Sequence, residues 1–192
     1  MKPTSLLTKL TPALLIPLVL PMIAAADSSA TVSTQHAPYR PRVQTLVDRV
    51  YANNRQFADI NVARSYGFHE LTTCVSGPQV GAMGIHMVLD KRMDGTVNPD
   101  EPEILIYEPL ANGYFRLVGV EFIVPMAAWK PTKEHPTPSV DGNLMNLITG
   151  PNRYGPDSLY EMHVWAFQQN PLGAYSDWNT RVSCEKQPSE RD

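Results

Sequence analysis

Cysteine is scarce in this chain of 192 residues, which has only two. This scarcity excludes the cysteine-dense frameworks that hold small secreted toxins together. A surplus of positive charge is also absent, since 16 Lys and Arg stand against 19 Asp and Glu. Proteins that bind the nucleic-acid backbone carry basic surfaces, so the charge balance argues against a nucleic-acid partner. Hydrophobic residues make up 43% of the chain, which excludes a wholly disordered protein and suits one domain with one core.

The standard catalytic motifs are missing as well. The sequence contains no Gly-x-Ser-x-Gly elbow, no Walker loop, no His-Glu-x-x-His and no Cys-x-x-Cys. It has no internal repeat either. Any chemistry must therefore come from residues that the fold brings together from separate parts of the chain.

The N-terminal segment has the pattern of a secretory signal peptide. Two lysines and an apolar stretch over residues 10–23 precede the small residues Ala24, Ala25 and Ala26. An uncleaved membrane anchor is the alternative, but the stretch is short for a bilayer and contains three prolines. We therefore predict a signal peptide over residues 1–26, a flexible leader over 27–40, and no stable membrane span after cleavage. The mature protein is expected to be secreted, either periplasmic or extracellular.

Both cysteines, Cys74 and Cys184, lie in the part predicted to be exported. In an oxidising compartment two such cysteines usually pair. A disulfide would close a loop of about 110 residues and stabilise the fold by roughly 4–5 kcal/mol in the loop-entropy model. Two free thiols or a thiolate metal site are the alternatives.

Hydrophobic periodicity changes along the chain from helical to alternating. Apolar residues at helical spacing predict an amphipathic helix from Pro41 to about Gln56, and Asp59 and Gly67 fit the two ends of a short second helix. After His69 the period becomes two, and four strands are predicted, over residues 82–89, 103–108, 114–124 and 159–168. Asn112 and Gly113 fit the turn of a hairpin.

These patterns predict a single α+β domain over residues 41–186. Its N-terminal helices are expected to pack on an antiparallel β-sheet or a small β-barrel, with one disulfide. The proline-rich segment 125–157 is predicted to be a long surface loop with a short apolar insertion, and residues 187–192 a tail.

Three of the predicted strands each carry a ligand-type side chain in an otherwise apolar run: His86, Glu121 and His163. A buried carboxylate or imidazole needs a cation, a metal or a hydrogen-bond partner. Two imidazoles and one carboxylate suit one divalent transition metal (Zn, Fe, Mn or Cu), with positions left open for water or substrate. Glu161 and Tyr107 are predicted catalytic or supporting partners of this site.

Strict alternation predicts the neighbours of these ligands on each strand face. Phe115 and Leu117 should share a face with Glu121, and Phe167 should share one with His163. Alignment of the three strand faces would bring the ligands to one point. The alternative is a buried hydrogen-bonded network of the same residues that only stabilises the core.

Three functions fit the sequence. The first is a secreted metal-binding protein, in its more specific form a mononuclear metalloenzyme that acts on a small molecule through the two histidines and the glutamate. The second is a non-catalytic envelope module that binds a hydrophobic ligand or a protein partner, with the segment 125–157 as its contact surface. The third is a metallochaperone or metal store, but the exposed Met- and His-rich tracts expected of one are missing.

Four short strings also resemble those of a group of small secreted bacterial proteins without assigned function. They are Gly-Ala-Met-Gly-Ile-His at 81–86, Gly-Val-Glu-Phe at 119–122, Glu-Met-His-Val-Trp at 161–165 and Asn-Pro-Leu-Gly at 170–173. The likeness covers about residues 63–184, and it implies that the helix end at 63–68 and Cys74 belong to the domain. It implies no substrate or reaction. Thr180 departs from the group, where a proline is expected.

Overall fold

The computed structural model describes residues 44–134 and 136–187. The predicted signal peptide and leader, the start of the first predicted helix and nearly all of the predicted tail lie outside these residues. Within the described ranges, no helix combines the length and the apolar character needed to cross a membrane.

Three short helices open the described part of the chain: α1 (Leu46–Asn54), the 3-10 helix η1 (Arg55–Ala58) and α2 (Ile60–Tyr66). At the start of α1 the Thr45 hydroxyl accepts a hydrogen bond from the Asp48 N–H, and the Asp48 carboxylate accepts one from the Thr45 N–H. This capping box satisfies N–H groups that the first helical turn leaves open. The Asp59 carboxylate caps α2 in a similar way, and Gly67 ends it with a φ of 111° that suits a residue without a side chain.

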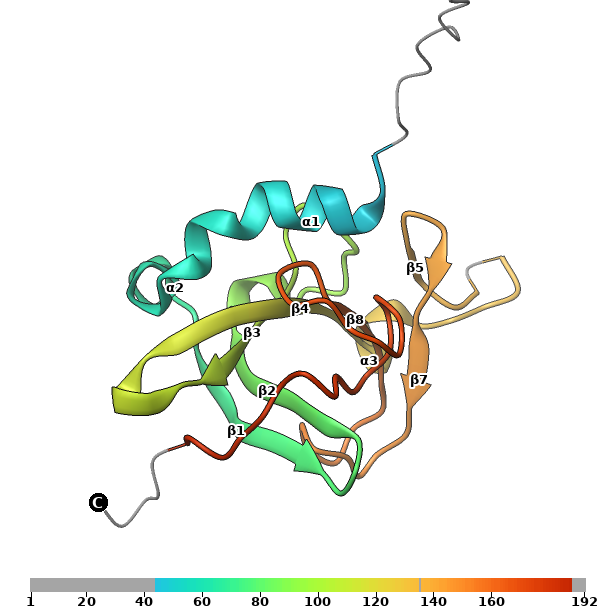
Figure 1. Ribbon diagram of the computed structural model, residues 1–192. Coiled ribbons are helices and arrows are strands. Elements are labelled where there is room, and N and C mark those ends of the chain that lie inside the picture. The colour runs from blue at the N-terminus through green and yellow to red at the C-terminus, as the bar shows by residue number, and fades with distance from the viewer. Residues whose placement is uncertain (1–43, 135, 188–192) are drawn as a thin grey trace, which may run out of the picture. The chain divides into compact units, whose positions relative to one another are not determined.

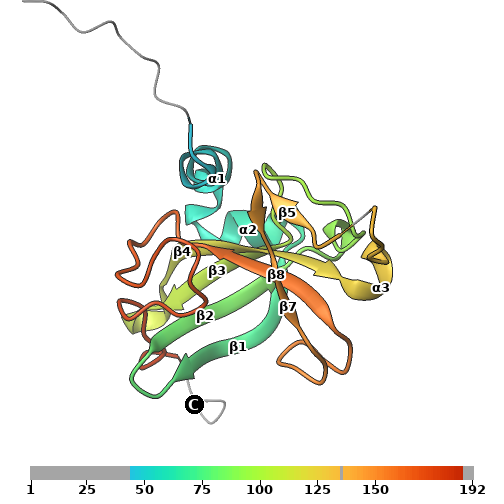
Figure 2. The same cartoon turned by 90° about the vertical axis from the view of Figure 1, so that its right-hand side faces the viewer.

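One antiparallel sheet forms the centre of the fold. In spatial order its strands are β1 (His69–Gly77), β2 (Gly81–Val88), β3 (Ile104–Pro109), β4 (Phe115–Pro125), β8 (Leu159–Val164) and β7 (Asn146–Ile148). The sheet curls into a half-barrel (Figure 1), and the view in Figure 2 shows the strands crossing as it twists. The remaining elements are η2 (Asp90–Arg92), η3 (Ala111–Gly113), α3 (Met126–Trp129) and the small hairpin of β5 (Ser139–Val140) and β6 (Asn143–Leu144). The predicted antiparallel sheet is confirmed.

Two strands of the sheet were not predicted from the sequence. β1 is partly exposed and its register with β2 shifts at several points, so its sequence lacks a regular apolar alternation. β7 has only three residues and lies inside the segment 125–157 that was predicted to be a loop. Both are edge strands, where burial imposes little pattern on the sequence.

The strand predicted over residues 159–168 is too long. β8 ends at Val164, and beyond it the N–H groups of Phe167 and Gln168 both donate to the Val118 carbonyl. The alternation predicted from the strand does not continue past its end. Phe167 consequently packs against the cluster that contains the helices, not beside His163.

The sheet separates two apolar clusters, one on each face. The larger cluster joins the helices to one face, which we call the helix face; its helix residues are Leu46, Val50, Phe57, Ile60 and Ala63. The smaller cluster lies on the opposite face, which we call the strap face, and comprises Ala82, Val88, Ile104, Ile106, Val118, Ile123, Leu159, Trp165 and Val182. Alternate residues of the same central strands thus enter different clusters.

Residues 174–184, which we call the C-terminal strap, lie across the strap face (dark red in Figure 1). Ala82 on β2 and Asn179 on the strap exchange two backbone hydrogen bonds, of 3.1 and 3.2 Å. Cys184 at the end of the strap forms a disulfide with Cys74 on β1. The predicted disulfide is confirmed, and it ties the strap to an edge of the sheet.

A β-bulge in β4 changes which side chains face the strap. The register between β3 and β4 shifts at Val118, which is an extra residue on β4. As a result Leu117 and Phe115 pack in the helix-face cluster, while Val118 lies in the strap-face cluster. The prediction that Phe115 and Leu117 share a face with Glu121 is wrong for this reason.

Candidate metal centre

The sheet register brings the three predicted ligands onto the strap face. Glu121 on β4 lies directly opposite His163 on β8, and on its other side opposite Ile104 on β3. His86 on β2 pairs with Ile106, two residues along β3 from Ile104, so His86 and Glu121 point to the same side of the sheet. All three ligand-type side chains are fully buried.

The distances between these side chains suit ligands of one ion. Nε2 of His86 lies 3.4 Å from Oε2 of Glu121, and Nδ1 of His163 lies 3.9 Å from Oε1 of Glu121. Neither ring nitrogen has a hydrogen-bond partner. Two ligand atoms that each lie about 2.1 Å from one ion are roughly 3.0–4.2 Å apart, from cis to trans arrangements. One ligand atom from each residue lies within 4.8 Å of the other two, so the group could hold a metal ion.

The second ring nitrogen of His86 is held from β1. Its Nδ1 makes a hydrogen bond of 2.9 Å with the Thr72 hydroxyl. A metal-binding histidine usually has its other nitrogen held in this way, because the bond orients the ring. Nε2 of His86 is the atom left to face Glu121.

A tight turn between β7 and β8 reaches into the same place. Asn152 and Gly155 exchange backbone hydrogen bonds of 2.8 and 3.1 Å, which puts Arg153 and Tyr154 at the tip of the turn. Nη2 of Arg153 donates to Oε1 of Glu121 at 3.1 Å. The Tyr154 hydroxyl donates to Oε2 of the same carboxylate at 2.6 Å. Each oxygen of Glu121 therefore has one donor and keeps a further lone pair.

Two more carboxylates complete the group. Glu161 on β8 accepts a hydrogen bond from Arg153 through Oε2, while its Oε1 has no partner. Asp177 comes from the strap, and its Oδ1 lies 3.7 Å from Nδ1 of His163. Glu161, His163 and Asp177 form a second set whose ligand atoms lie within 4.8 Å of one another. We call the whole group the buried polar cluster: His86, Glu121, Arg153, Tyr154, Glu161, His163 and Asp177.

Buried side-chain atoms that lack a hydrogen-bond partner occur in only one part of the described structure. Among the described residues, the buried side-chain nitrogen and oxygen atoms without a hydrogen-bond partner are Nε2 of His86, Nε of Arg153, Oε1 of Glu161, both ring nitrogens of His163 and Oδ1 of Asp177. All of them belong to the buried polar cluster. Each such atom costs about 1–3 kcal/mol when nothing compensates it, so the cluster is suited to receive a ligand.

Burial decides the charge of the two imidazoles. It lowers the pKa of His86 to about 3, with a further contribution from the positive charge of Arg153. Burial likewise holds the pKa of His163 well below its ordinary value, assisted by the nearby His86 and Arg153. Both rings are therefore neutral at physiological pH, which is the form that binds metals.

The carboxyl groups respond in the opposite direction. Burial raises the pKa of Glu121, and repulsion from Glu161 raises it further, although Arg153 and Tyr154 oppose the shift. Burial and Glu161 also raise the pKa of Asp177. Without an added cation, the cluster disfavours ionisation of these acids.

The structure does not bring Tyr107 to this cluster. Its ring lies on the helix face, and its hydroxyl donates to the Phe57 carbonyl at 2.6 Å. His69 is also elsewhere, about half-exposed and 2.9 Å from a carboxylate oxygen of Asp90. Glu161, by contrast, lies beside the predicted ligands.

Four members and neighbours of the site were missed from the sequence: Thr72, Arg153, Tyr154 and Asp177. Asn152 and Gly155 flank Arg153 and Tyr154 with turn-forming residues, which is a local signal for a turn. Nothing in that signal indicates that the turn folds onto the sheet. Asp177 depends on the path of the strap, which is a long-range property.

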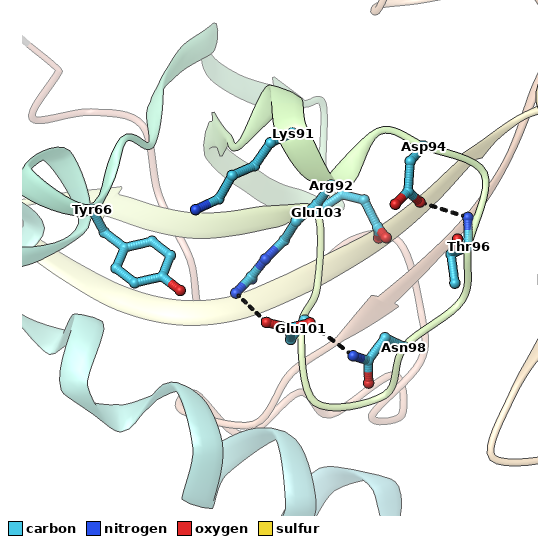
Figure 3. Close-up of a pocket in the computed structure, with 8 residues that line it drawn as sticks. All are labelled: Tyr66, Lys91, Arg92, Asp94, Thr96, Asn98, Glu101 and Glu103. Atoms are coloured by element: carbon cyan, nitrogen blue, oxygen red, sulfur yellow. Dashed lines mark hydrogen bonds and ion pairs between the residues drawn. The ribbon is translucent and has the colours of Figure 1, made fainter.

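A separate cavity of about 230 Å³ lies away from the cluster (Figure 3). It is lined by Tyr66, Lys91, Arg92, Asp94, Thr96, Asn98, Glu101 and Glu103. Its polar groups largely satisfy one another: Glu101 accepts from Arg92 at 3.5 Å and from Asn98 at 2.9 Å. The Lys91 ammonium lies 4.7 Å from the Tyr66 ring centroid. The buried polar cluster is the stronger candidate site because its atoms lack such partners.

The fold and the site together define a curled antiparallel sheet that encloses a buried His-Glu-His group able to hold a metal ion. No protein-family model, no curated protein and no solved structure matches the chain. The resemblance to small secreted bacterial proteins stays a prediction.

Proposed function

We propose that this is a secreted metal-binding protein that holds one divalent transition ion between His86, Glu121 and His163. One observation carries the proposal: ligand atoms of these residues lie within 4.8 Å of one another, while the facing ring nitrogens have no hydrogen-bond partner. Neutral imidazoles and a carboxylate are the ligands that Zn, Fe, Mn and Cu share. The ion would supply the partner that these atoms lack.

The charges of the cluster also support a divalent cation. In their ionised forms the carboxylates of Glu121, Glu161 and Asp177 outnumber the single guanidinium of Arg153 by two charges. A buried excess of this size is strongly unfavourable in a medium of low dielectric constant. An ion of charge two would balance it and would favour ionisation of Glu121.

Secretion is part of the proposal because of the disulfide and the predicted signal peptide. Disulfides persist in oxidising compartments and are rare in the cytosol. The bond between Cys74 and Cys184 is compatible with export of the chain. The periplasm or the extracellular space would then be the site of metal binding.

Catalysis on a small molecule is the more specific form of the proposal. A metal-bound water is more acidic than free water, and a nearby carboxylate can take its proton. We assign that role to Glu161; the assignment is supported by its Oε1, which is buried in a ligand group with His163 and has no hydrogen-bond partner. The side chains of Arg153 and Asp177 are 20% and 33% exposed, so these two members of the cluster are partly accessible to solvent.

A second candidate function has its own supporting observation. Nη2 of Arg153 donates to both Glu121 and Glu161, so a guanidinium already acts as a cation between two carboxylates. In this alternative the cluster only stabilises the core, and the protein is a non-catalytic envelope module that binds a hydrophobic ligand or a protein partner.

Elemental analysis separates the two candidates. The chain is exported to an oxidising compartment and purified without chelators or a histidine tag. We expect about one transition-metal ion per chain, and its loss in His86→Ala and in His163→Ala. His69→Ala is the matched control, because this histidine is exposed and lies outside the cluster, and it should keep the metal.

Full metal content in His86→Ala would overturn the assignment of the ligands. No bound metal in the wild-type protein, even after reconstitution with Zn, Mn, Fe or Cu, would favour the structural network. Circular dichroism of each variant checks that metal loss is not a consequence of unfolding.

A further inference from the structure

Asp177 is the member of the buried polar cluster that does not come from the sheet or from the turn at its edge. It lies on the C-terminal strap, and its Oδ1 faces Nδ1 of His163 at 3.7 Å. This oxygen is buried without a hydrogen-bond partner, although the residue is partly exposed. His163, which is fully buried, has no hydrogen-bond partner on either ring nitrogen.

The strap holds Asp177 from both sides. The Ser176 carbonyl accepts a hydrogen bond from the indole N–H of Trp165, and the Trp178 carbonyl accepts one of 2.8 Å from Asn170. These bonds fix the backbone next to Asp177. Because the backbone is held on both sides of Asp177, the position from which its side chain reaches the cluster is fixed.

The distance from Asp177 to His163 again suits two ligands of one ion. It is too long for a hydrogen bond and falls within the roughly 3.0–4.2 Å expected between two ligand atoms of a transition metal. Nδ1 of His163 is within reach of both carboxylates, 3.9 Å from Oε1 of Glu121 and 3.7 Å from Oδ1 of Asp177. Without a metal ion, an ionised Asp177 would add negative charge beside Glu161 and Glu121, which the single positive charge of Arg153 does not balance.

We propose that Asp177 is a fourth ligand of the ion, so that metal binding joins the C-terminal strap to the sheet. The proposal rests on the metal site of the preceding section. In the structure Asp177 forms a ligand group with Glu161 and His163, which shares His163 with the group of His86 and Glu121. The ion would draw the Asp177 carboxylate toward His86 and Glu121 and so complete a set of two nitrogen and two oxygen ligands. A ligand on the strap also makes closure of the strap dependent on the ion, in addition to the disulfide at the end of the strap.

The test compares Asp177→Asn with Glu185→Gln in the full, exported chain. Both changes convert an acid to its amide near the same end of the chain, and Glu185 is exposed. Zn²⁺ affinity is measured by competition with a chelator on metal-free protein. We expect the affinity to fall at least about tenfold in Asp177→Asn and to be unchanged in Glu185→Gln.

Hydrogen exchange of the strap provides a readout that a merely structural aspartate would not change. Zn²⁺ should slow exchange at the amides of residues 174–182 in the wild-type protein and in Glu185→Gln, but not in Asp177→Asn. The metal-free Asp177→Asn protein should be at least as stable as the metal-free wild type, because the change removes a carboxyl group whose ionisation beside Glu121 and Glu161 is unfavourable.

The failures of the two proposals can be told apart. Wild-type protein that binds no Zn²⁺ would overturn both the metal site and the role of Asp177. Equal Zn²⁺ affinity and equal strap protection in wild type and Asp177→Asn would overturn the role of Asp177 alone. A metal-free Asp177→Asn protein that is less stable than the wild type, with unchanged Zn²⁺ affinity, would make Asp177 a structural residue.

Discussion

The two faces of the same sheet differ in how completely their buried groups are satisfied. The helix face is packed with apolar side chains from both the strands and the helices. The strap face has fewer apolar residues and contains the buried histidines and glutamates of the cluster. Neighbouring residues of one strand, such as Met87 and His86, belong to the two different faces.

This difference indicates a division of labour between the faces. A core made of apolar side chains gains stability from burial and close packing. A buried polar cluster with unused hydrogen-bonding atoms costs stability unless a ligand completes it. Apolar packing on the helix face can therefore stabilise the fold. The unpaired polar atoms on the strap face lower stability, and a bound ligand would compensate them.

The largest expected effect comes from a substitution on the helix face. Met87 is 2% exposed in the larger cluster, and Met87→Ala leaves a cavity there, so the free energy of unfolding should fall by about 2–5 kcal/mol. Metal content should stay at the wild-type level, because the side chain points away from the cluster. Urea denaturation and elemental analysis of the same preparation check both statements.

His86→Ala changes the residue before Met87 on the same strand, and it should affect metal binding more than stability. It is expected to abolish metal binding, and in metal-free protein it should destabilise less than Met87→Ala. Loss of metal from folded Met87→Ala protein would show that packing on the helix face controls metal binding on the strap face. It would contradict the separation of stability and binding between the two faces.

The sequence was sufficient to predict those features that depend on alternation in central strands. His86, Glu121 and His163 could be identified because each interrupts an apolar run that both faces of the sheet bury. The two cysteines were enough to predict the disulfide. Predictions were wrong where the alternation is interrupted. At the bulge in β4 an extra residue moves the preceding side chains of the strand to the opposite face of the sheet.

The remaining site residues depend on long-range chain paths. Arg153, Tyr154 and Asp177 come from a turn and a strap that fold back onto the sheet. No local pattern distinguishes such segments from loops that stay in solvent. Tyr107 shows the reverse case: its type suits catalysis, but its position on β3 directs it to the helix face.

A buried acid outside the cluster gives a smaller, pH-dependent effect. Burial raises the pKa of Glu103 to about 8, against an ordinary value of 4.5, although its carboxylate accepts a hydrogen bond from the Ile123 N–H. Between these two pH values the folded state keeps a proton that the unfolded state has lost. Stability from this group is therefore complete below pH 4.5 and falls by up to about 1.4 kcal/mol per pH unit until pH 8.

Glu103→Gln removes this titration, so its stability should decline less than that of the wild type over the same range. Urea denaturation from pH 4 to pH 9 measures the difference between the two slopes. The difference should persist in metal-loaded protein, since Glu103 is not part of the cluster. Parallel pH profiles for the two proteins would show that Glu103 is ionised in the folded state.

The smallest effect distinguishes two tyrosines that lie on opposite faces of the sheet, the buried Tyr107 and the partly buried Tyr154. Tyr107→Phe removes the hydrogen bond to the Phe57 carbonyl and should cost about 1 kcal/mol of stability, with no change in metal affinity. Tyr154→Phe removes the donor to Glu121, so it should alter metal affinity, which a chelator competition measures. If Tyr107→Phe changed the metal affinity instead, with stability unaffected, the catalytic role expected for Tyr107 from the sequence would be supported. Such a result would contradict the separation of the two faces, because the Tyr107 hydroxyl bonds on the helix face and would nevertheless change metal affinity on the strap face.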